Sequence, residues 1–200
     1  MHRAAREANA NGDGRRARSL YRELLALNPR HVRARNNLAL LLEQEGDHEN
    51  ALKELDKCLA LEPANPQVLV NRGAVLGAMA RYNEAERDLK KVLDIEPTNP
   101  EAHFNLGLVT SRKGLWNQAI PHLRKAIDLD PSRGMVHYYL GEALNHIDDL
   151  AGAMESFQRA AELRPGNAKA LYGMGIILDR MNRPEEAARM YRRSRELTNR

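Results

Sequence analysis

Two histidines, His103 and His137, lie 34 residues apart, and histidine is the commonest metal-binding side chain. A metal site needs three or four converging ligands, but no carboxylate or thiol recurs beside either histidine. Leucine occupies the equivalent places, Leu69 and Leu171, which indicates a helix-packing position. The sequence also lacks a glycine-rich phosphate loop, a CxxC pair and an HExxH motif. We therefore predict no metal, no cofactor, no catalytic residue and no enzymatic activity.

Prolines, alanines and small residues recur along the chain at intervals of 34 residues. The three series are Pro29, Pro63, Pro97, Pro131 and Pro165; Ala17, Ala51, Ala85, Ala119, Ala153 and Ala187; and Ala39, Gly73, Gly107, Gly141 and Gly175. A period of this length is typical of stacked helical repeats, in which each unit buries its apolar face against its neighbours. The sequence therefore predicts a stack of repeats rather than one globular core.

Apolar residues within each repeat follow helical spacing in two segments. In residues 100–133, Asn99–Pro100 is a helix start and Asp130–Pro131 is a helix end. We expect an antiparallel helix pair in each repeat, with turns near Gly46, Gly114 and Asp148. Glycine in the middle of a helix costs about 0.5–1 kcal/mol relative to alanine, so its recurrence in the first helix predicts a close contact with the second.

This pattern resembles that of the tetratricopeptide repeat (TPR) family, which is W-x2-L-G-x2-Y, then A-x3-F, then P. Leu140-Gly141, Ala153, Phe157 and Pro165 match it in one repeat. The family tryptophan and tyrosine are absent from their places in every repeat. The resemblance covers essentially the whole chain. It implies an all-α, right-handed α-solenoid of stacked antiparallel helix pairs, the TPR superhelix.

The phase of the repeat predicts a single TPR solenoid over residues 1–200. The expected units are a partial N-terminal repeat at 1–31 and repeats at 32–65, 66–99, 100–133, 134–167 and 168–200. The single cysteine, Cys58, excludes an internal disulfide framework and fits a reducing compartment. No apolar run approaches the roughly 20 residues of a membrane span. We therefore expect a cytoplasmic protein that does not insert into membranes.

The resemblance also implies which residues would face a ligand, because TPR proteins line a concave groove with the first helix of each pair. The predicted peptide-binding residues are Asn37, Asn71, Asn105, Phe104, Tyr138, Tyr172, Arg112 and Glu142. The asparagine amides offer a donor and an acceptor to a peptide backbone, or else they bond within their own repeat. The aromatic residues would be binding anchors, or else packing at helix contacts.

Two classes of partner are disfavoured by the sequence. TPR domains that capture chaperone C-terminal tails use a Lys-plus-Asn pair in the first and third groove columns, and no repeat here has that pair. The net charge of +4 is concentrated at the ends, with +4 in residues 1–30 and +4 in residues 180–200. Basic ends attract nucleic acid, but exposed solenoid ends must be polar in any case. We therefore expect neither a chaperone tail nor a specific nucleic acid as the partner.

We predict a protein–protein interaction scaffold that binds a peptide or helical segment of a partner in the concave groove. One alternative is an assembly or self-association adaptor that uses the ends or the outer face. Another is a regulatory TPR segment of a larger enzyme. Nucleic-acid association through the basic ends is less favoured, and strong salt dependence of binding would point to it.

Overall fold

The computed structural model describes residues 1–199, which form twelve α-helices and contain no strand. The chain divides into two compact units, Met1–Pro97 and Thr98–Arg200. Unit 1 contains α1 (His2–Ala10), α2 (Gly14–Leu27), α3 (Val32–Gln44), α4 (His48–Leu61), α5 (Pro66–Ala78) and α6 (Tyr82–Ile95). Unit 2 contains α7 (Pro100–Arg112), α8 (Trp116–Leu129), α9 (Gly134–His146), α10 (Leu150–Leu163), α11 (Ala168–Arg180) and α12 (Pro184–Thr198). Among these helices, none is both long and apolar enough for a membrane span.

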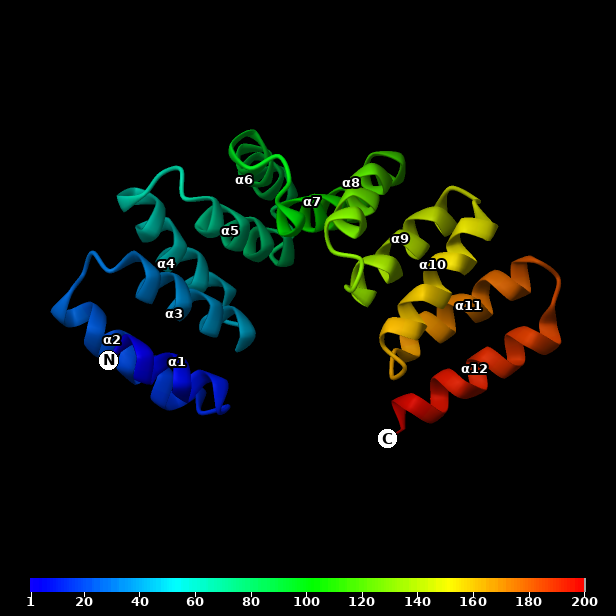
Figure 1. Cartoon of the computed structure of the whole chain (residues 1–200), viewed down its shortest axis with the longest axis horizontal. Coiled ribbons are helices and arrows are strands. Elements are labelled where there is room, and N and C mark those ends of the chain that lie inside the picture. The colour runs from blue at the N-terminus through cyan, green and yellow to red at the C-terminus, as the bar shows by residue number, and fades with distance from the viewer. Residues whose placement is uncertain (200) are drawn as a thin grey trace. The chain divides into compact units, whose positions relative to one another are not determined.

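Within each unit, successive helices form antiparallel pairs, and each pair packs against the next (Figure 1). In unit 2, for example, α9 pairs with α10, while α8 packs against α9 and α10 against α11. The predicted all-α fold of stacked antiparallel helix pairs is therefore confirmed.

Asparagine caps explain where several first helices begin. The side chain of Asn65 accepts the backbone N–H of Val68, and that of Asn99 accepts the N–H of Ala102. In both helices a proline follows the cap, where its missing N–H costs no helical hydrogen bond. These signals recur at the 34-residue interval, so the local sequence sets the phase of the helix pairs.

Each mid-helix glycine lies against a large side chain of the paired second helix. A Cβ atom on Gly107 would lie 2.7 Å from Leu123 Cγ, and one on Gly141 would lie 2.8 Å from Phe157 Cδ1. The same relation joins Gly73 to Leu89 and Gly175 to Tyr191. Leu123 and Phe157 are buried in the unit 2 core. Glycine therefore lets the two helices approach closely while the opposing side chain fills the space that a Cβ would occupy.

We predict that Gly107→Leu destabilises the protein by about 1–3 kcal/mol, because the new side chain would overpack the contact with Leu123. Urea unfolding followed by circular dichroism measures the change. Gly166→Ala is the control, because a Cβ at Gly166 meets no atom within 4 Å. Equal unfolding midpoints for Gly107→Leu and the parent protein would contradict the predicted role of this glycine.

The turn inside every helix pair places one residue in the left-handed backbone region. The six residues are Gly12, Gly46, Ala80, Gly114, Asp148 and Asn182, with φ between 58° and 80°. The turns predicted near Gly46, Gly114 and Asp148 are therefore confirmed. Glycine adopts this conformation freely, and short polar residues such as Asp and Asn tolerate it. Ala80 has neither advantage, so its turn is strained.

We predict that Ala80→Gly stabilises the protein by about 0.5–1 kcal/mol. A left-handed alanine costs about 1–2 kcal/mol, and the extra chain entropy of glycine offsets part of the gain. Ala78→Gly, at the last residue of α5, is the matched control and should destabilise instead. Thermal unfolding of the two variants checks the opposite signs, and a loss of stability in Ala80→Gly would refute the strain.

Candidate functional site

The two asparagines predicted to face a ligand in unit 1 are engaged in bonds inside the unit. Asn71 is buried, its Nδ2 donates to Asn36 Oδ1 at 2.8 Å, and its Oδ1 accepts from Gln67 at 3.3 Å. The half-buried Asn37 has its Nδ2 3.2 Å from His2 Nε2. Burial and nearby positive groups lower the pKa of His2, which favours a neutral ring that accepts from the amide.

Asn105 differs from the other two members of this series. It lies half-buried on α7, and its amide makes no hydrogen bond to any other side chain or backbone group of residues 1–199. Its donor and acceptor are therefore available to a ligand.

Phe104, the next residue along the chain, is a packed side chain. It is 8% exposed and belongs to the unit 2 core. Its ring lies 5.8 Å from the ring of Tyr139, and the Arg133 guanidinium lies 5.3 Å from its centroid, within the range of a cation–π contact. Phe104 therefore supports the residues around it and offers little surface of its own.

Tyr138 is half-buried on α9 and held on several sides. Its ring lies 5.3 Å from Tyr139 and 5.8 Å from Phe157, and its hydroxyl donates to Glu142 at 2.6 Å. Burial, reinforced by the bond to Glu142, raises the pKa of Tyr138. The phenol therefore remains a proton donor at neutral pH, and one oxygen of Glu142 is occupied by it.

Tyr172, on α11, is 55% exposed and is the most accessible of the predicted aromatic residues. Its ring lies 5.2 Å from that of Tyr191, whose hydroxyl donates to Asp179 at 2.7 Å. Burial and this bond raise the pKa of Tyr191 to about 12. Tyr172 is thus an exposed ring supported from behind. Arg112, at the end of α7, is also exposed.

A pocket of about 770 Å³ opens between α9 and the connection from α10 to α11. Its lining residues are Met135, Tyr138, Tyr139, Leu163, Arg164, Pro165, Gly166, Asn167, Ala168 and Lys169, and we call it the Tyr138 pocket. Of the predicted site residues, only Tyr138 lines it. Since α7 contacts α9 and α9 contacts α11, the first helices share one surface in unit 2. We call Asn105, Tyr138, Tyr139, Glu142 and Tyr172 the first-helix face.

Sequence reasoning missed most of this pocket. Met135 is 44% exposed although it lies near the start of a helix, and Lys169 lies one turn into the next first helix. An exposed methionine two residues before a tyrosine pair was the available signal. The contribution of the connection after α10 had none, because it depends on how two repeats stack.

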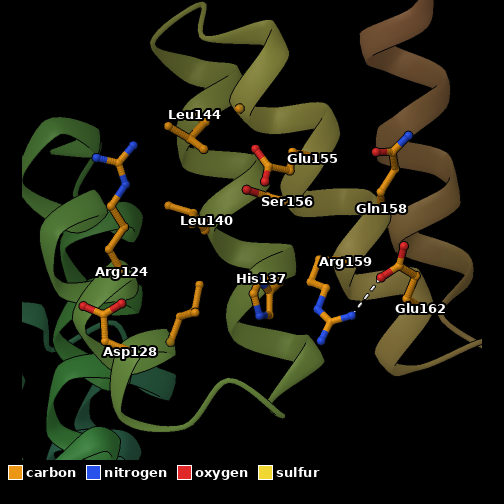
Figure 2. A pocket seen from close by; sticks show the side chains of 12 residues that line it. Arg124, Asp128, His137, Leu140, Leu144, Glu155, Ser156, Gln158, Arg159 and Glu162 are labelled. Carbon is orange, nitrogen blue, oxygen red and sulfur yellow. Dashed lines mark hydrogen bonds and ion pairs between the residues drawn. The ribbon is translucent and has the colours of Figure 1, made fainter.

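A second hollow lies over the second helices of unit 2, with a volume of about 630 Å³. Figure 2 shows Arg124 and Asp128 on one side, Glu155 and Arg159 on the other, and a dashed line joining Arg159 to Glu162. Leu140 and Leu144 contribute buried side chains to its lining. Both charge signs surround this outer groove, so its electrostatics select no particular partner.

Equivalent positions in unit 1 carry ion pairs instead. Arg35 pairs with Glu54, and Arg72 bridges Asp56 and Asp88 at 2.7 Å each. Burial alone would raise the pKa of Glu54, but hydrogen bonds from Lys57 and Arg35 outweigh it and the pKa is lowered. The counterparts of Arg35 and Glu54 in the outer groove of unit 2 are a histidine and a serine, without such a bridge.

The histidines flagged at the start lie at helix-packing positions. His103 Nδ1 is 3.1 Å from His122 Nδ1, and His137 Nε2 is 3.3 Å from the carbonyl oxygen of Pro131. Within the part of the chain described, no three potential metal ligands come together.

Comparisons with known proteins give the family. A profile described as tetratricopeptide repeat matches residues 2–66 and 110–168, and a second profile of that description matches 148–199. A TPR repeat profile matches residues 81–114. No curated protein gives a significant match.

Several solved structures share the fold at low sequence identity. PilF of Pseudomonas aeruginosa has a TM-score of 0.82 at 23% identity, covering 94% of this chain and 86% of its own. MamA of Desulfovibrio magneticus RS-1 has a TM-score of 0.74 at 24% identity, covering 84% and 95%. YrrB, described as a TPR protein with an unusual peptide-binding site, has a TM-score of 0.68 at 24% identity, covering 88% and 91%. The family profiles span more than half of the sequence, and the chain belongs to the tetratricopeptide repeat family.

Proposed function

We propose that this protein is an interaction scaffold that binds a peptide or short helical segment of a partner on its first-helix face. TPR proteins are generally protein-interaction scaffolds. The observation that carries the proposal is the Tyr138 pocket, where Met135 and two tyrosines surround a cavity beside the exposed Tyr172. Large aromatic side chains in such positions dominate binding energies at protein interfaces.

The rigidity of the face supports the same proposal. Tyr138 is fixed by Phe157, Tyr139 and the bond to Glu142, so little side-chain freedom would be lost on binding. The unpaired amide of Asn105 would hold the backbone of an extended segment. Arg112 lies exposed at the end of the same helix and would contact the segment's end.

The remaining predicted residues have supporting roles in this proposal. Phe104 would position Tyr139 from beneath, because their rings are in contact. Asn37 and Asn71 in unit 1 would bind a peptide only by exchanging their present hydrogen bonds for bonds to the ligand. We therefore assign most of the binding energy to unit 2.

We predict that Tyr172→Ala weakens partner binding by about 2 kcal/mol, roughly 30-fold in affinity, because an exposed anchor is truncated without opening the core. A peptide selected by the wild-type protein from a random display library serves as the ligand for calorimetry. Leu27→Ala is the matched control, because Leu27 is an exposed apolar residue on a second helix.

A second variant, Tyr138→Ala, should weaken binding by a similar amount, although loss of its contact with Phe157 will also lower stability. Circular dichroism therefore accompanies each titration. If both tyrosine variants remain folded and bind with unchanged affinity, the first-helix face of unit 2 is not the binding surface.

A further inference from the structure

The chemistry of the Tyr138 pocket indicates what kind of segment it takes. Its lining is largely apolar and aromatic, with Met135, Tyr138, Tyr139, Leu163 and Pro165 contributing side chains. Its volume of about 770 Å³ falls within the roughly 300–1,000 Å³ of typical ligand pockets. A bulky apolar side chain of a partner therefore fits it.

The charged residues of the lining all have one sign. Arg164 and Lys169 are both exposed, and no aspartate or glutamate lines the pocket. Neither cation forms an ion pair with another residue of the described chain. Glu142, the carboxylate that Tyr138 contacts, lies outside the lining and accepts the phenol proton. The pocket is thus an apolar cavity with an uncompensated positive rim.

This pattern sets the pocket apart from other basic residues of unit 2. Arg133 pairs with Glu101 at 3.2 Å, and Arg180 contacts Asp148. The mixed rim of the outer groove likewise contains an internal pair, Arg159 with Glu162. Only at the Tyr138 pocket do two cations face a cavity without a carboxylate beside them in the lining.

We propose that the Tyr138 pocket binds a partner peptide through a bulky apolar side chain next to an acidic residue. The apolar side chain enters between Met135 and the tyrosine pair, and the neighbouring carboxylate pairs with Lys169 and Arg164. The inference rests on the proposed function, since it names the ligand of the same face. A rim charge of this kind contributes mainly to selectivity and association rate.

A peptide fits the pocket better than a single-stranded nucleic acid, which would also match positive charge and aromatic rings. Stacked bases need an open ring face. Tyr139 already contacts Phe104 and Tyr138, and Tyr138 contacts Phe157. The remaining wall is methionine, leucine and proline, which suits an aliphatic or aromatic side chain.

The test compares peptide selection by three forms of the full chain: wild type, Lys169→Glu and the control Lys125→Glu. Lys125 is an exposed lysine on α8 that does not line the pocket. The random library is displayed with its C-terminus fused to the carrier, so only side-chain carboxylates respond. We expect wild type and Lys125→Glu to enrich peptides with an apolar residue beside Asp or Glu.

Lys169→Glu should bind those peptides about tenfold more weakly and enrich peptides with Lys or Arg in the acidic place. Wild-type peptides without an acidic preference, but sensitive to Tyr172→Ala, would overturn this inference and leave the proposed function standing. Unchanged binding of the acidic peptide by folded Lys169→Glu would also overturn it. Displacement of the peptide by a single-stranded oligonucleotide at physiological salt would overturn it in favour of nucleic acid. If wild type enriches no peptide, both proposals fail.

Discussion

The contact between a glycine of one helix and a large side chain of its partner determines the spacing within the later helix pairs. Gly107 against Leu123 and Gly141 against Phe157 are two instances of one geometry repeated every 34 residues. Glycine lowers helix propensity, yet the close approach lets the opposing side chain bury most of its surface. Because each pair is built in this way, stability accumulates from neighbouring contacts rather than from one central core.

This constraint explains why the fold follows from the sequence while much of the site does not. The period, the asparagine–proline starts and the left-handed turns are local signals that act the same way in every repeat. Burial within a column is different, because neighbours decide it. Phe104 and Tyr172 occupy equivalent positions, yet Tyr139 and Arg133 cover the first while the second is 55% exposed. The predicted column located the aromatic residues but could not separate packing from exposure.

The same argument applies to the hollows between helices. Arg35 pairs with Glu54 in unit 1, whereas His137 and Ser156 take their places in unit 2. The repeat tolerates either solution because these positions lie outside the glycine contact. Removing one partner of a partly buried ion pair is costly, so such positions change together or not at all. Chemistry specific to this protein therefore resides in residues that break the period, and one repeat alone does not reveal them.

The Tyr138 pocket combines both kinds of residue, which bears on how it would act. The tyrosine rings are fixed by periodic neighbours such as Phe157, whereas Lys169 and Arg164 are free of ion pairs and exposed. A fixed apolar cavity limits the conformational entropy lost on binding, so affinity would arise there. The mobile cations would add little affinity in water, because exposed ion pairs are worth about 0–1 kcal/mol. They would instead disfavour basic segments, since like charges brought together at the rim repel one another. Affinity and selectivity would thus depend on different residues of one pocket.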